Sequence, residues 1–157
     1  VTIVDQVDKQ FLPQVQLIQV GTAVSFPNSD AIRHHVYSFS AAKQFEIRLY
    51  SGVPTAPVLF DKPGLVVLGC NIHDGMIGYI VVADDHFIAK TNSQGRLQLP
   101  APVSNIQVWH PRLLRINQLV EFKLNEAKSP QTVTVKIKPA TSTPKAQFGN
   151  KLIRHAR

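Results

Sequence analysis

The hydrophobic residues of this chain fall into short runs, and residues that favour turns interrupt these runs at short intervals. The segment 45–49 alternates between apolar and polar residues, and the segment 132–137 does the same. Turn signals such as Pro27-Asn28 and Lys62-Pro63-Gly64 separate the runs. No stretch of 12 or more residues repeats with the period of a helix. Many short strands with regular turn signals predict an all-β sandwich or barrel.

The candidate strands are distributed along the chain and stop short of its last twenty residues. They are residues 1–4, 15–20, 22–26, 34–39, 45–50, 58–60, 65–69, 76–82, 87–90, 97–99, 106–109, 118–124 and 132–137. A break near Asp84-Asp85 divides them into a larger first set and a smaller second set with turns of its own. We therefore expect a domain over residues 1–84, a small β domain over 85–138 and a tail over 139–157.

Positive charge is concentrated at the end of the chain. Residues 1–126 hold ten Lys or Arg and ten Asp or Glu, whereas residues 127–157 hold seven Lys or Arg and no acid. The tail is expected to be flexible and able to contact acidic partners. No basic stripe interleaved with aromatic residues runs through the body, which argues against specific nucleic-acid binding. No apolar run approaches the roughly 20 residues of a transmembrane helix.

The only cysteine and the only methionine stand six positions apart, with a histidine midway between them: Cys70, His73 and Met76. A loop between two candidate strands can direct a thiolate, an imidazole and a thioether at one point. Two His, one Cys and a weak axial Met are the ligands of blue-copper sites. A second histidine is available upstream, at His34 or His35. Adjacent residues of a strand face opposite sides, so periodicity leaves open which of the two points inward.

Each of these residues also has a more ordinary interpretation. A lone buried Cys is usually a small hydrophobic residue, and a lone Met fills a core. His, Cys and His also suit zinc, and the thioether of Met76 favours copper instead. A Cys–His nucleophile is disfavoured because Cys70 and His73 share one loop of an all-β chain and no orienting residue is evident.

These residues resemble the cupredoxins, the plastocyanin-like blue-copper proteins. The pattern is Asn28, His34-x-Val36, Phe60-x-x-x-Gly64 and Cys70-x-x-His73-x-x-Met76, with the tight spacing of the amicyanins. The resemblance implies a Greek-key β-sandwich with one copper per chain, held by His34, Cys70, His73 and Met76. It favours His34 over His35.

The resemblance also bears on the residues around the ligands. The family usually has Asn after the first ligand, where it braces the Cys loop. His35 stands at that position here, so Asn28, His35 and Asn71 are the candidates for supporting the ligands. Gly69 stands where many relatives carry a larger, often aromatic side chain, which puts an electron route through that side chain in doubt.

More broadly, residues 1–138 resemble the plastocyanin-like proteins often labelled methylamine-utilisation proteins. In those, a small sandwich similar to the carboxypeptidase regulatory-like module follows the cupredoxin. The segments Thr91-x-x-x-Gly95-x-x-x-Leu99-Pro100 and Val108-Trp109-His110-Pro111 carry this part of the likeness. The resemblance implies export to the periplasm after removal of a signal peptide that is absent from this chain.

The coordination that the resemblance implies indicates an electron carrier and not an enzyme, because no position stays open for substrate. Redox partner proteins are expected to dock near His73, over a surface that includes Pro27, Ile72 and Gly75. Two alternatives come from other classes: a module that stores or delivers copper, and a β-sandwich adaptor that binds proteins and has a secondary metal site.

Overall fold

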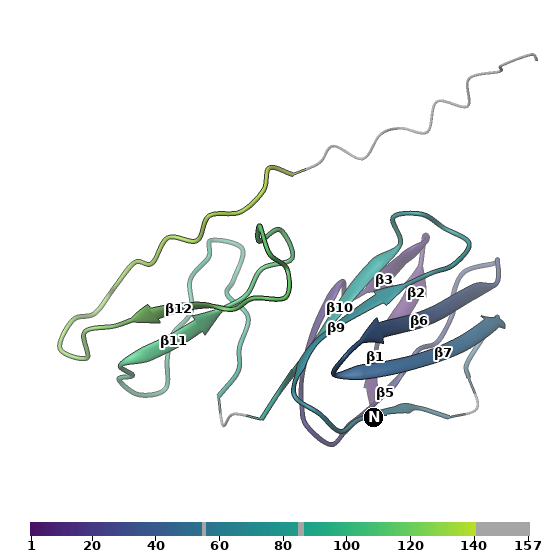
Figure 1. Cartoon of the computed structure of the whole chain (residues 1–157), viewed down its shortest axis with the longest axis horizontal. Helices are drawn as coiled ribbons and strands as arrows, with labels where there is room; N and C mark the ends of the chain where they lie inside the picture. Colours follow the sequence, from purple (N-terminus) through teal and green to yellow (C-terminus); the bar gives the residue numbers. More distant parts are fainter. Residues whose placement is uncertain (55, 85–86, 141–157) are drawn as a thin grey trace, which may run out of the picture. The chain divides into compact units, whose positions relative to one another are not determined.

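The computed structural model describes residues 1–54, 56–84 and 87–140, and all of its regular structure is β. Contacts divide the chain into two units, Val1–Ala101 and Pro102–Arg157 (Figure 1). No helix occurs in the described residues, so none of them forms a helix that could cross a bilayer. The predicted all-β class is confirmed. The tail residues 141–157 lie outside the described part of the chain.

Most of the predicted strands in the first unit are present, with shifts of one or two residues at their ends. The strands are β1 (Thr2–Ile3), β2 (Asp5–Val7), β3 (Gln10–Leu12), β4 (Val15–Gln19), β5 (Thr22–Ser25), β6 (His34–Ser40), β7 (Lys43–Tyr50), β8 (Val58–Phe60), β9 (Gly64–Gly69), β10 (Ile77–Ala83), β11 (Asn105–Val108) and β12 (Val120–Lys123).

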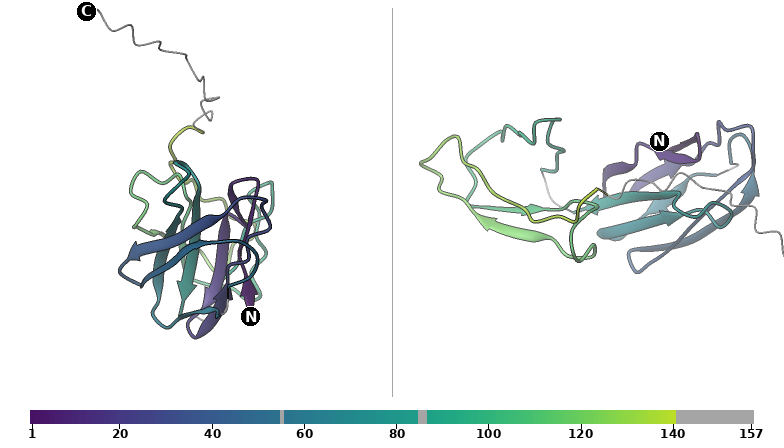
Figure 2. Two further views of the ribbon diagram at one scale, coloured as in Figure 1. Left: turned by 90° about the vertical axis from the view of Figure 1, so that its right-hand side faces the viewer. Right: turned by 90° about the horizontal axis from the view of Figure 1, so that it is seen from above.

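The first unit is a sandwich of two main sheets (Figure 1, Figure 2). The larger sheet has the order β4-β10-β9-β6-β7, and the smaller has the order β1-β5-β8. Side chains alternate across each strand, so every second residue points into the space between the sheets. Both sheets contribute to one core, whose buried members are Val4, Phe11, Ile18, Val24, Phe26, Val36, Phe60, Val66, Leu68, Cys70, Met76, Ile80 and Val82.

The β2–β3 hairpin is absent from the sequence prediction. Its turn residues Asp8 and Lys9 have φ angles of 52° and 59°, in the left-handed region that Gly and Asn usually occupy. Its inward residue on β2 is Gln6, which is fully buried although it is polar. Gln6 Nε2 donates to the carbonyl of Pro27, and this bond offsets part of the cost of burial. The sequence pattern therefore does not predict this hairpin, because its buried residue is polar and its turn contains no Gly.

The described residues after position 84 form less regular structure than the sequence predicts. Strands β11 and β12 form an antiparallel pair, and Trp109 Nε1 donates to the Ile116 carbonyl within the turn that joins them. Residues 87–90, 97–99 and 132–137 are not strands, and of the last segment only Ile137 forms a bridge, with Leu113. Alternation makes a segment suitable for a strand, but a strand also needs a neighbour along its length. The small sandwich over 85–138 and its boundary at 84 stay predictions.

Tyr50 ends β7, and its hydroxyl is held between two parts of the first unit. The hydroxyl donates to the Phe26 carbonyl and accepts from Gln6 Nε2. Burial raises the pKa of Tyr50 from 10.0 to about 12, although the hydrogen bond from Gln6 acts in the opposite direction.

This shift predicts a loss of stability in alkaline solution. The unfolded chain releases the phenolic proton near pH 10, whereas the folded chain keeps it until about pH 12. Between these values the native state binds more protons, so the free energy of unfolding falls as pH rises. Urea unfolding of the wild type and of Tyr50→Phe across this range measures the effect. Equal pH dependence in the two proteins would contradict the assignment.

Candidate metal centre

Two side chains of one loop meet a third, which is distant in sequence, at one end of the sandwich. His34 is the first residue of β6, and it shares the inner face with Val36 and Ser38. Cys70 directly follows β9, which pairs with β6 through Tyr37 and Gly69. His73 lies in the loop that connects β9 to β10. The pairing of β6 with β9 thus brings His34 beside the Cys70 loop.

The loop from Cys70 to Met76 is short and turns tightly. The Met76 amide donates to the His73 carbonyl at 3.2 Å. Gly75 has a φ of +87°, a conformation that L side chains rarely adopt. The loop therefore folds back on itself within seven residues, and both of its ends are buried, at Cys70 and at Met76.

The atoms of the cluster are spaced as ligands of one ion would be. Cys70 Sγ lies 3.8 Å from His34 Nδ1 and 3.7 Å from His73 Nδ1. With the bond lengths typical of zinc sites, about 2.3 Å to sulfur and about 2.0 Å to nitrogen, trigonal coordination separates sulfur from nitrogen by about 3.7 Å. The ligand atoms of all three residues lie within 4.8 Å of one another. The sulfur–nitrogen distances of the cluster thus fit those around one metal ion.

The cluster is shielded from water on one side only. His34 is 0 % exposed and Cys70 is 6 % exposed, whereas His73 is half-buried. Burial lowers the pKa of His73, and the charges of His34 and Lys9 lower it further against the opposing effect of Asp30. A lowered pKa favours the neutral ring, which is the form that binds metal.

The remaining predicted ligand, Met76, is 3 % exposed and belongs to the same buried core as Cys70. The three-residue cluster suits zinc as well as copper. A thioether is a soft donor that zinc sites rarely use, so Met76 is the residue that would favour copper. Its role as a ligand stays a prediction.

Asp30 contacts the cluster, and the sequence analysis missed it. His34 Nε2 donates to Asp30 Oδ2 at 2.6 Å, on the side of the ring opposite Cys70. Burial raises the pKa of Asp30, but hydrogen bonds from the Lys9 amide, His34 and the Asp8 amide outweigh it and leave the pKa below its usual value. The available signal was a carboxylate four positions before a candidate ligand, since ligand histidines are commonly held by carboxylates.

The three candidates for supporting residues occupy different environments. Asn28 is buried, its Nδ2 donates to the carbonyls of Ile32 and Tyr50, and its Oδ1 accepts from the Asp30 amide. His35 points to the outer face of the sheet, with Nε2 3.0 Å from Glu46 Oε1. Asn71 is exposed in the loop. Of the three, Asn28 has contacts that lead to the cluster, through Asp30.

Gly69 faces an aromatic ring from the neighbouring strand. A Cβ atom at this position would lie 2.7 Å from Cζ of Tyr37, closer than real side chains approach. Tyr37 in turn packs against Phe39 and His35, with ring centroids 5.1 Å and 5.8 Å apart. The space that a larger residue would fill at position 69 is thus occupied from β6.

Comparison with known proteins finds likeness in structure but not in sequence. No protein-family model and no curated protein sequence matches the chain. Among solved structures, a Cu-containing nitrite reductase from Thermus scotoductus SA-01 matches 54% of this chain at 29% identity, with a TM-score of 0.50. The match spans only 22% of that enzyme.

Two smaller proteins also match about half of the chain. An amicyanin mutant is 19% identical over 52% of this chain and 81% of its own, with a TM-score of 0.48. A purple cupredoxin from Nitrosopumilus maritimus is 21% identical over 52% of this chain and 96% of its own, with a TM-score of 0.45. The fold of about half of this chain thus resembles part of a copper-containing enzyme, and the His34–Cys70–His73 cluster fits one copper site per chain.

Proposed function

We propose that this protein carries single electrons through a copper ion held by His34, Cys70, His73 and Met76. The observation that carries the proposal is the convergence of one sulfur and two nitrogens, with Cys70 Sγ 3.8 Å and 3.7 Å from the two Nδ1 atoms. Bound copper would supply a one-electron couple. The three clustered residues and a thioether fill the coordination of a blue-copper site, which leaves no position for a substrate.

The buried and the more exposed residues of the site have different roles. His34 and Cys70 are buried and fixed by the sandwich, so they hold a constant geometry and keep water away. Little movement on a change of charge keeps the barrier to electron transfer low. His73 is half-buried and is the most exposed member of the cluster. Its ring is therefore the natural route between the site and a partner at the surface.

Titration of the metal-free protein with Cu(II) tests the proposal. An intense visible band from thiolate-to-copper charge transfer is expected to grow until one equivalent is bound. Reduction should bleach the band and reoxidation should restore it. A colourless complex, or saturation far below one equivalent, would contradict an electron carrier. Rapid loss of Cu(I) to a chelator would instead favour copper delivery.

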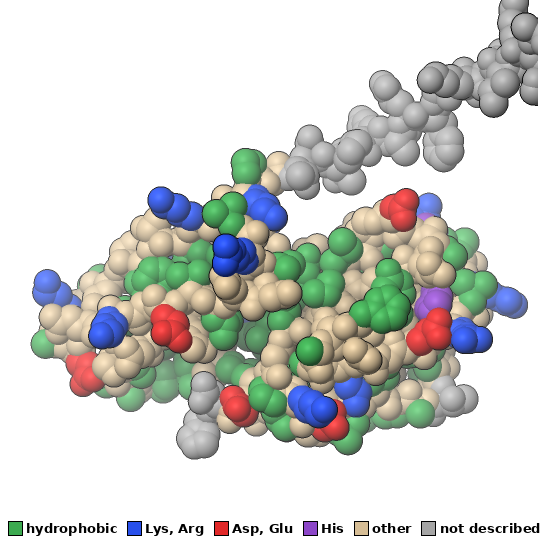
Figure 3. Space-filling model, viewed as in Figure 1, with side chains coloured by type: hydrophobic (Ala, Val, Ile, Leu, Met, Phe, Trp, Pro, Cys, Tyr) green, Lys and Arg blue, Asp and Glu red, His purple; other side chains and the backbone are tan. Residues whose placement is uncertain are grey.

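We further propose that a redox partner docks over the exposed edge of His73. Hydrophobic side chains are exposed close to the site in sequence, Ile72 at 50 % and Ile77 at 43 %. Figure 3 shows hydrophobic side chains exposed on the visible face of the first unit. Such residues allow close approach of a second protein without the cost of removing water from charges. The periplasmic location stays a prediction, which cell fractionation would test.

Electron self-exchange provides a partner of known identity for testing this surface. Two molecules that meet through the His73 surface must bring their Ile72 side chains together, so Ile72→Lys places like charges in that encounter. The self-exchange rate measured by NMR line broadening should fall, and added salt should partly restore it. Leu59→Lys, at a residue 51 % exposed on β8, is the matched control. An equal fall in both variants would contradict docking near His73.

A further inference from the structure

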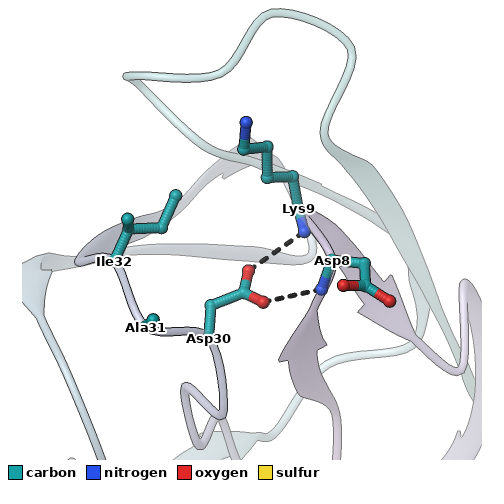
Figure 4. A pocket seen from close by; sticks show the side chains of 5 residues that line it. All are labelled: Asp8, Lys9, Asp30, Ala31 and Ile32. Atoms are coloured by element: carbon teal, nitrogen blue, oxygen red, sulfur yellow. Dashed lines mark hydrogen bonds between the residues drawn. The ribbon is translucent and has the colours of Figure 1, made fainter.

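The Asp30 carboxylate is held by three hydrogen bonds from two separate parts of the first unit. Its Oδ1 accepts from the Asp8 amide at 2.7 Å, and its Oδ2 accepts from the Lys9 amide at 3.0 Å (Figure 4). The same Oδ2 accepts from His34 Nε2 at 2.6 Å. The side chain is only 13% exposed and lines an open surface pocket together with Ala31 and Ile32.

The backbone of Asp30 and the turn that binds its carboxylate are both held in place. Its amide donates to Oδ1 of the buried Asn28 at 3.1 Å. On the other side, Asp8 and Lys9 are consecutive left-handed residues, so their N–H groups converge on one acceptor, as in an anion-binding nest. A left-handed conformation is unfavourable for residues other than Gly, and the bonds to Asp30 offset that cost. The carboxylate therefore has one defined place.

This placement decides which nitrogen of His34 carries the proton. A carboxylate only accepts hydrogen bonds, so the ring must present a proton on Nε2. In the neutral imidazole the other nitrogen then has its lone pair free. That nitrogen is Nδ1, the atom 3.8 Å from Cys70 Sγ. The ring is thus prepared to bind a metal before any metal arrives.

We propose that Asp30 is a positioning residue that sets the tautomer of His34, and that the β2–β3 turn is part of the metal centre because its amides hold Asp30. The inference rests on the proposed copper function only for its effect on the bound metal. The tautomer and the clamp on the turn are properties of the metal-free protein.

The first test uses metal-free protein with 15N-labelled histidine. Long-range 1H–15N correlation spectra near neutral pH should show Nε2 protonated and Nδ1 unprotonated in His34. Amide exchange at Asp8 and Lys9 should be slow in the wild type and faster in Asp30→Ala. A proton on Nδ1 of wild-type His34 would overturn the proposal, whether or not any variant folds.

The second test measures the loaded protein. Asp30→Ala is expected to weaken copper binding about 10- to 100-fold, the usual loss when a partner of a ligand histidine is removed. Asp30→Asn removes the negative charge, so the reduction potential of the bound copper should be higher in this variant than in the wild type. Asp5→Asn is the matched control: it removes an equal charge from the hairpin that holds Asp30, and Asp5 accepts from Ser29 Oγ and does not contact a ligand.

The outcomes separate the two proposals. If Asp30→Ala destabilises the fold but keeps the wild-type tautomer, copper affinity and potential, then Asp30 serves the turn alone and the inference is wrong. If the wild type gives no charge-transfer band although His34 has the expected tautomer, the electron-carrier proposal fails and the positioning role stands.

Discussion

Cys70→Ser protein is expected to lose the visible charge-transfer band completely and to bind Cu(II) weakly. The band requires a thiolate in the coordination sphere, and the serine hydroxyl stays protonated at neutral pH and is a harder donor. Cys70 is the only cysteine in the chain, so no other thiolate can replace it. Titration of wild type and variant with Cu(II), followed by visible absorption and EPR, measures the loss.

Two further variants make this test specific. Met76→Leu should keep the band and raise the reduction potential, because an axial thioether stabilises Cu(II) relative to Cu(I) only weakly and leucine does not do so at all. Cys70→Ala should match Cys70→Ser in colour. A band that survives in either Cys70 variant would show that the copper bound elsewhere.

Phe11→Ala is expected to lower the free energy of unfolding by about 3–5 kcal/mol, as for other fully buried aromatic residues. Phe11 is 1 % exposed and belongs to β3, so its ring joins the β2–β3 hairpin to the core of the sandwich. Denaturant unfolding of metal-free protein measures the loss. Phe39→Ala, at a ring that is 81 % exposed, should change stability by less than about 0.5 kcal/mol.

The contact between Phe11 and Gly78 allows a double-mutant test. A Cβ at Gly78 would lie 2.9 Å from Cβ of Phe11, so Gly78→Ala alone should cost about 1–3 kcal/mol through overpacking. In the Phe11→Ala background the same change fills vacated space, and its cost should shrink or reverse. Strictly additive losses would contradict the packing described for β3 and β10.

The parts of the site that could be predicted are those with a local signal. Cys70, His73 and Met76 stand on one short loop, so their spacing alone indicated a soft-metal site. His34 and His35 shared every local property, and only the placement of β6 in the sandwich directs one of them inward. Asp30 had no periodic pattern around it. Its contact with His34 depends on the Asp8–Lys9 turn, which is more than twenty positions away.

The strands, like the site residues, could be predicted only where the sequence has a local signal. Segment 45–50 was identified because its apolar residues follow the strand period, and segment 58–60 because it is a short apolar run that turn residues follow. The β2–β3 hairpin was missed because Gln6 is polar yet buried, and what makes that burial tolerable is a carbonyl from Pro27. In the second unit, segment 132–137 has ideal alternation, but none of the described residues forms a strand along its length. The period of the apolar residues indicates which face of a segment can be buried. It does not indicate which other segment of the chain packs against that face.

The contact between Tyr37 and Gly69 has a consequence for tracing the ancestry of such chains. The aromatic ring next to the cysteine strand comes from the adjacent strand, so two positions 32 apart in the sequence have to change together (69 − 37). An alignment that compares columns one at a time does not detect this dependence between the two positions. Superposed coordinates make such a dependence visible, because they place the ring of Tyr37 beside position 69.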